Sequence, residues 1–355
     1  MNSKTPQFDK ALAEYFAKLE LDEKGGQWRT CRFSGNKFYV RPDDIAFYKK
    51  IGVPLPTLEP AARLRRRLAY YTSYNLFRTT SAHSGRPIIS MYPPDTPFKV
   101  YEHQVWFSDI WDPMKFGVAP EGEISFFKQF ETFRQAVPRP NLIYAGMNIN
   151  SDYANFSRDL KNCYLAFEAV KGENLYYLAG FIDNKDCVDG DTLARCDTCY
   201  RARFVEDSYD CAFVEDSKMC TNSAFLLDCR NCQSCFMSSN LRHKKYYFRN
   251  KQLSKEEYQE KMRAINLGNY DVLESYQKEF EQMRKEMKYK LDHNFRSVNS
   301  VGDFLENSKN CYLSYSLWES ENVNYSLGGL QYRDSYDITG GCGRELCYEL
   351  ISVST

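Results

Sequence analysis

This chain of 355 residues has few histidines and no net charge. Because 47 basic side chains balance 47 acidic ones, no overall field draws the protein to nucleic acid or to a membrane. No apolar run approaches the roughly 18 residues of a membrane span, and the polar N-terminal stretch does not resemble a signal peptide. We therefore expect a cytoplasmic protein without membrane attachment. Imidazole catalysis has only four candidates: His83, His103, His243 and His293.

Sequence signatures of catalysis are absent as well. The chain contains no G-x-S-x-G, Walker loop, H-E-x-x-H or G-x-G-x-x-G pattern. These absences leave enzymatic activity uncertain and favour a non-enzymatic protein.

A 12-residue period follows position 150. Cys163, Cys187, Cys199 and Cys211 lie on one grid, and Leu175 takes the remaining slot. Twelve extended residues cover about 40 Å of backbone, enough for one turn of a β-solenoid of the parallel β-helix type. Helical repeats need longer periods. We therefore predict stacked rungs of about 12 residues, with cysteines inside and Asn or Asp at the bends.

A second copy of this pattern begins 148 residues later. Lys161–Leu165 (KNCYL) returns as Lys309–Leu313, and residues 161–200 share 13 identities in 40 positions with the later copy. In the second copy the grid holds Cys311, Val323, Ser335 and Cys347.

The remaining segments predict a mixed α+β protein. Strand-like runs at 37–40 and 87–92 and helical patterns at 60–76 and 123–136 suggest an α+β domain with long loops. Ser254 with Glu257 forms a capping box ahead of an apolar helical stripe from Leu273 to Leu291. We expect these helices to lie against the solenoid; the alternative is a dimerisation arm. The expected segments are a docking helix (1–24), an α+β domain (25–150), a first solenoid half (151–239), a helical hairpin (240–298) and a second solenoid half (299–355).

The 13 cysteines have two interpretations. Cys229, Cys232 and Cys235 repeat the C-x-x-C spacing of zinc knuckles, so zinc at these three is one possibility. However, Leu, Val and Ser replace Cys at other grid positions, which favours small buried side chains and no cofactor. We expect stacked core thiols.

A basic helix and a tryptophan-rich segment suggest two further sites. On the helix Arg63, Arg66 and Arg67 share a face that could contact phosphates, and Tyr74 and Arg78 follow closely, so unpaired bases could stack there. A solvated charged face is the simpler explanation.

The tryptophan-rich segment contains Trp106, Asp109, Trp111 and Asp112, which suggests carbohydrate binding or an acid pair. Core packing by the tryptophans and turn capping by the aspartates is the alternative.

Five stretches carry a resemblance to a known family: Asp44–Pro56, Pro87–Tyr101, Trp106–Gly117, Asn162–Leu165 and Leu241–Tyr258. Over its whole length the chain resembles an uncharacterised cysteine-rich family of uncultivated, small-genome bacteria. That family's first domain looks like paired zinc ribbons followed by a cysteine-repeat region, and the resemblance supplies no activity.

The expected zinc ligands are mostly missing from this sequence. The eight positions hold Cys31 with Ser34, Glu59 with Ala62, Ser81 with Ser84, and Glu102 with Val105. Because only Cys31 is a cysteine, the resemblance implies a degenerate, metal-free ribbon-like domain.

Together these patterns predict a non-enzymatic binding or scaffold protein that presents a rigid solenoid face. A protein partner or self-association is the expected interaction. The alternatives are nucleic-acid binding through the Arg63–Arg67 helix and a carbohydrate-active β-helix.

Overall fold

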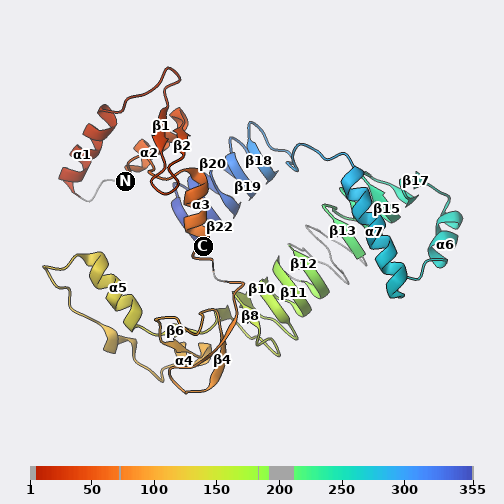
Figure 1. Cartoon of the computed structure of the whole chain (residues 1–355), viewed down its shortest axis with the longest axis horizontal. Coiled ribbons are helices and arrows are strands. Elements are labelled where there is room, and N and C mark those ends of the chain that lie inside the picture. Colours follow the sequence, from red (N-terminus) through yellow and green to blue (C-terminus); the bar gives the residue numbers. More distant parts are fainter. Residues whose placement is uncertain (1–4, 72, 183, 192–211, 354–355) are drawn as a thin grey trace. The chain divides into compact units, whose positions relative to one another are not determined.

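A computed structural model describes residues 5–71, 73–182, 184–191 and 212–353 (Figure 1). The chain divides into two compact units, one of Met1–Tyr71 with Tyr289–Thr355 and one of Thr72–Lys288. This division cuts the expected α+β segment 25–150 at Tyr71. Cys196, Cys199 and Cys211 lie outside the described residues.

Helices occur before, between and beside the sheets. They are α1 Pro6–Ala17, α2 Pro42–Ile51, α3 Pro60–Leu68, α4 His103–Trp106, the 3-10 helix η1 Pro113–Phe116, α5 Phe126–Ala136, α6 Lys255–Arg263 and α7 Tyr270–Glu286. In the part of the chain that the structure describes, none of them is long and apolar enough to cross a bilayer.

The strands form mostly parallel sheets; only β1–β2, β3–β4 and β16–β17 pair antiparallel among the described residues. The expected mixed α and β class is therefore confirmed. In the first unit the strands are β1 Gln27–Thr30, β2 Lys37–Val40, β18 Val301–Glu306, β19 Tyr312–Trp318, β20 Glu321–Asn324, β21 Leu327–Leu330, β22 Arg333–Gly341 and β23 Tyr348–Val353. In the second they are β3 Phe77–Thr80, β4 Pro87–Ser90, β5 Val100–Tyr101, β6 Arg139–Pro140, β7 Tyr144–Ala145, β8 Ala154–Asn155, β9 Ser157–Arg158, β10 Tyr164–Val170, β11 Glu173–Ile182, β12 Lys185–Asp191, β13 Ala212–Glu215, β14 Ala224–Leu227, β15 Gln233–Ser239, β16 Lys245–Phe248 and β17 Lys251–Gln252.

From β10 to β16 and from Gly302 to β23, paired residues of the parallel strands lie 12 apart in sequence, as the period predicts. Tyr164 pairs with Tyr176, and Leu175 pairs with Cys187. The second copy keeps this register, for example between Val323 and Ser335. There β19, β20, β22 and β21 pair in a small closed ring.

A left-handed residue recurs at every third position of the repeats. From 307 to 322 the backbone φ lies between 47° and 55° at Asn307, Asn310, Leu313, Ser316, Glu319 and Asn322. Each left-handed residue turns the chain, so a 12-residue period contains four such turns. Asn adopts this conformation more readily than most residues, which explains its frequency there.

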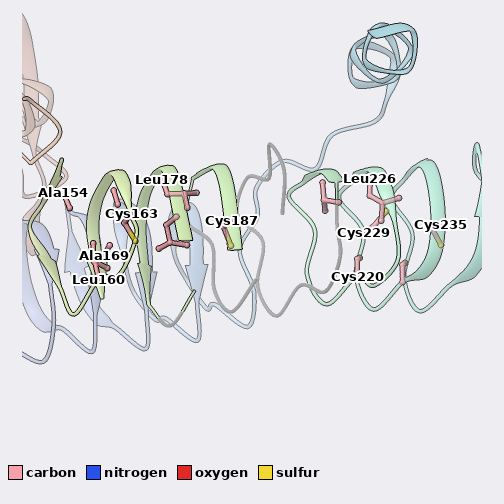
Figure 2. Packing of buried hydrophobic residues seen from close by; sticks show 14 of the residues in the cluster. Ala154, Leu160, Cys163, Ala169, Leu178, Cys187, Cys220, Leu226, Cys229 and Cys235 are labelled. Carbon is pink, nitrogen blue, oxygen red and sulfur yellow. The ribbon is translucent and has the colours of Figure 1, made fainter. Parts of the chain in front are cut away.

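The residue after each of these turns points inward. Side chains at 308, 311, 314, 317, 320 and 323 are at most 1% exposed, and Figure 2 shows the corresponding side chains of the first copy, such as Cys163 and Leu178, within successive turns of the ribbon. Inward-pointing side chains therefore occur at every third residue. The 12-residue grid of cysteines marks every fourth one of them.

Inward Ser and Cys residues make the same hydrogen bonds. Ser320 Oγ donates to the Trp318 carbonyl (2.9 Å) and accepts from the Tyr332 amide (3.2 Å). Cys311 Sγ likewise donates to a carbonyl two residues earlier (3.5 Å) and accepts from the Val323 amide. Because these bonds satisfy buried backbone groups, a small side chain with a donor and acceptor atom suits these positions.

The helical hairpin lies against the second unit's sheet, as expected. Phe225 and Phe236 of the sheet contact Tyr276 of α7, and Phe280 is 4% exposed. The apolar stripe of α7 is thus largely covered within the chain, which removes the main support for a dimerisation arm. In the first unit the end of α1 packs through Tyr15 and Phe16 against the cluster around α2.

Candidate functional site

A polar ladder runs along the second copy at its left-handed turns. Asn299 Nδ2 donates to Asn310 Oδ1 (2.9 Å), Asn310 to Asn322 (3.1 Å) and Asn322 to Asp334 (2.7 Å). The ladder forms one wall of a cleft of about 870 Å³, and α2 supplies the facing residues. The described part of the first unit therefore contains an open cleft with a regular polar wall.

Helix α2 contacts this wall through charged side chains. Lys50 Nζ lies 2.8 Å from Asp334, and the Arg41 guanidinium lies 3.6 Å from the centre of the Tyr312 ring. Tyr325 Oη donates to Asp44 Oδ2 (2.7 Å). Burial and the Asp44 carboxylate both raise the pKa of Tyr325, so its hydroxyl stays protonated and remains a donor.

Local sequence positions α2 for these contacts. Pro42 occupies the first turn, where a missing N–H costs nothing, and Gly52 (φ 70°) ends the helix in the left-handed conformation. Asp44 also accepts a hydrogen bond from the Arg41 backbone amide (3.0 Å). The same carboxylate therefore caps the helix and accepts the hydrogen bond from the Tyr325 hydroxyl. Phe47 stacks on Tyr336 at 3.8 Å.

Two of the predicted phosphate-binding arginines are buried. Arg63 and Arg67 are 2% and 3% exposed, and both contact the fully buried Asp337 at 3.0 and 2.8 Å. Arg67 also donates to Thr339 Oγ1 and to the Tyr325 carbonyl. The prediction of a shared exposed arginine face is therefore wrong for these two residues, because both form buried ion pairs with Asp337.

The other residues of that prediction are not part of this buried cluster. Arg66 is exposed and pairs with Glu349 of the same unit. Tyr74 and Arg78 belong to the second unit, where Tyr74 Oη donates to Glu168 (3.2 Å) and Arg78 is exposed on β3.

The first pair of expected zinc-ligand positions converges on a carboxylate. Ser34 Oγ donates to Glu59 Oε1 (2.7 Å), and Cys31 lies buried in the same turn. Burial alone would raise the pKa of Cys31, but hydrogen bonds from Ser34 and from backbone amides outweigh it and lower that pKa to about 7.

The second pair repeats this arrangement without a cysteine. Ser81 Oγ donates to Glu102 Oε2 (2.5 Å), and Ser84 Oγ donates to Glu102 Oε1. Burial alone would raise the pKa of Glu102, but the hydrogen bonds from the two hydroxyls outweigh burial. The pKa of Glu102 therefore lies below its ordinary value. One thiol, hydroxyls and single carboxylates do not fit the tetrahedral thiolate set of a zinc ribbon.

The tryptophan-rich segment is held by packing and capping. The Trp106 and Trp111 ring centres are 6.0 Å apart, and both indole N–H groups donate to backbone carbonyls at 2.9 Å. Asp112 accepts from the Met114 amide and caps η1, while Asp109 is exposed. These contacts match the structural alternative for the tryptophans and Asp112.

The predicted thiol tract lies in the core. Cys229, Cys232 and Cys235 are at most 1% exposed, and each thiol donates to the carbonyl two residues before it at 3.4–3.5 Å. Contact with the Cys232 thiol, together with burial, raises the pKa of Cys229 and Cys235. Within the described ranges, no group of three or more His, Cys, Asp or Glu side chains is arranged to hold a metal ion.

Sequence analysis did not identify the residues of α2 that contact the ladder. The available signal was the set of identities between the copies, because Tyr177 and Asp189 correspond to Tyr325 and Asp337. Some inward positions change between the copies, as from Leu175 to Val323, whereas these two outward positions do not.

Comparison with protein families and with curated proteins identified no relative of this chain. No protein-family model matches the chain, and no curated protein matches it.

Proposed function

We propose that this protein is a non-enzymatic binding scaffold in which two β-solenoid segments present ladder faces to helices. Support for the solenoid comes from the 12-residue pairing register and from the four left-handed turns in each period. Stacked rungs give a face whose side chains recur about every 4.8 Å, a spacing that flexible loops cannot hold.

The observation that carries this proposal is that the chain's own helices dock on both proposed solenoid segments. In the first unit α2 contacts the polar ladder and α3 contacts Asp337. In the second unit α7 packs on β14 and β15 through aromatic side chains. A surface that binds helices within the chain has the chemistry to bind helices of other proteins.

Two N-terminal turns, at 31–34 and 81–84, would serve this scaffold as rigid elements. We propose that 27–62 and 77–105 are degenerate ribbons in which hydrogen bonds to Glu59 and Glu102 take the place of a shared metal ion. Both turns have the same backbone pattern: the amides of Gly35 and Gly85 donate to the carbonyls four residues earlier.

The test is equilibrium binding of the full chain to a panel of fluorescent amphipathic helical peptides. We expect saturable anisotropy changes for some peptides and none for proline-interrupted versions of the same composition, because proline breaks the helix. Mass spectrometry of the peptides should show them unchanged. If no peptide binds at up to about 1 mM, the limit of a useful affinity, or if bound peptides are converted, the proposal is wrong.

A further inference from the structure

The first copy repeats the surface that α2 and α3 cover in the second copy. Tyr164 and Tyr177 lie edge to face with ring centres 5.7 Å apart and an interplanar angle of 87°. Tyr312 and Tyr325, 148 residues later, lie 5.8 Å apart at 87°. The two tyrosine pairs are therefore the same structure in two places.

The polar ladder is also repeated. Asn162 donates to Asn174 (3.2 Å), and Asn174 donates to Asp186 (2.6 Å). The matching bonds of the second copy measure 3.1 and 2.7 Å. Asp186 thus occupies the place of Asp334, and Asp189 occupies the place of Asp337.

Exposure distinguishes the two surfaces. Tyr325 is 8% exposed beneath α2, whereas Tyr177 is 52% and Tyr164 is 39% exposed. Asp186 is exposed and Asp189 is partly exposed, while Asp337 is fully buried. We call Tyr164, Tyr177, Asp186 and Asp189 the open tyrosine face.

The covered copy shows which groups this arrangement binds. Arg41 stacks on the tyrosine ring, Asp44 accepts the tyrosine hydroxyl, and Lys50 pairs with the last carboxylate of the ladder. Arg63 and Arg67 of α3 neutralise the second carboxylate. Four cations and one carboxylate therefore face two tyrosines and two aspartates.

We propose that the open tyrosine face binds a helical segment of a partner protein. That segment carries an arginine at its start, an aspartate three residues later and a lysine six residues after that, the pattern of Arg41, Asp44 and Lys50. Charge complementarity supports a cationic helix, because the face offers the carboxylates of Asp186 and Asp189 and the ring faces attract guanidinium groups. This inference rests on the proposed scaffold function and specifies the class of partner.

One difference between the copies affects the partner's apolar contacts. Val188 stands where Tyr336 stacks on Phe47. A partner helix meets a smaller side chain there, so its residue at the position of Phe47 packs on an aliphatic side chain rather than on a ring.

The probe is a fluorescein-labelled synthetic peptide with the sequence of residues 39–69, which includes the five charged residues that contact the covered face: Arg41, Asp44, Lys50, Arg63 and Arg67. We expect saturable binding to the full chain, measured by anisotropy. Tyr177→Phe removes one hydrogen bond to a carboxylate and should weaken binding about tenfold. Asp186→Asn with Asp189→Asn should weaken it at least as much and reduce its salt dependence.

Matched variants separate this contact from general effects. Tyr315→Phe removes a hydroxyl from an exposed tyrosine of the second copy and should leave the affinity unchanged. A peptide with Arg41→Ala and Asp44→Ala should bind weakly to every form of the chain. Circular dichroism of the Tyr177→Phe protein checks that it remains folded.

Three results would overturn the inference. The first is no binding of the 39–69 peptide, and the second is equal affinity for the native chain and the Tyr177→Phe variant. The third is self-association that Tyr177→Phe abolishes, since this would place a second copy of the chain on the face. If other helical peptides of the panel still bind, only the inference fails, whereas loss of all peptide binding would also refute the proposed function.

Discussion

The guanidinium of Arg67 lies 2.8 Å from the carboxylate of Asp337, although 270 residues separate them in the sequence. Both side chains are at most 3% exposed, and Arg63 contacts the same carboxylate. This cluster fastens the N-terminal helices to the C-terminal strands within one unit.

We predict that Asp337→Ala lowers the free energy of unfolding by about 3–5 kcal/mol, because it leaves buried guanidinium groups without a counter-ion. Urea titration followed by circular dichroism measures this. Asp334→Ala removes the partly exposed partner of Lys50 and should cost about 1 kcal/mol or less. Equal losses for the two variants would show that burial does not determine the strength of these pairs.

Glu102 should make stability depend on pH in the acid range. Its folded-state pKa is lowered, so its contribution is present above the ordinary value of 4.5 and is lost as the pH falls through the lower folded value. We expect Glu102→Gln to be less stable than the native chain near pH 7, with a difference that shrinks towards about pH 3. Glu121→Gln, an exposed control, should show no such change, and a constant difference for Glu102→Gln would contradict the prediction.

The core thiols should resist alkylation in the native protein. Cys229, Cys232 and Cys235 are buried, and the thiols of Cys229 and Cys235 have raised pKa values, so iodoacetamide should modify them only after unfolding. Cys342 and Cys347 are partly exposed and should react before these three. Peptide mass spectrometry measures the order. Zinc bound in a fixed ratio to the native chain would refute our assignment of these thiols to backbone hydrogen bonds.

Left-handed turns that lack Asn or Gly offer stabilising substitutions. Leu313 has φ 47° and is 36% exposed, so Leu313→Asn should raise the free energy of unfolding by about 1 kcal/mol. Tyr315→Asn, two residues away at an exposed position outside the left-handed set, should bring no gain. A thermal scan of both variants checks the prediction, and stabilisation by both would remove the conformational explanation.

The sequence predicted the periodic part of the fold well. The 12-residue register and the inward cysteines follow from spacing alone, because repeated contacts between neighbouring turns leave a regular pattern. Helical spacing also predicted α3 and α5, but the helix expected over 60–76 ends at Leu68. The three-residue inward spacing could also have been found, since Ser, Cys, Ser, Leu, Ser and Val occur at every third position from Ser308 to Val323.

The candidate site could not be predicted in the same way. Arg63 and Arg67 look like a solvated basic helix until Asp337 is placed beside them, and that contact joins segments with no shared pattern. Likewise, Lys50 and Asp334 are ordinary surface residues in the sequence. Contacts between non-repeated and repeated segments depend on tertiary structure that periodicity does not encode.

The long separation between Arg67 and Asp337 has a consequence for folding order. Neighbouring turns pair residues 12 apart, so they can form as soon as two turns have been synthesised. The arginines of α3 must wait for another 270 residues, which takes roughly 15–50 s at ordinary translation rates. During that interval the aromatic and cationic side chains of α2 and α3 that contact these strands remain uncovered on the nascent chain.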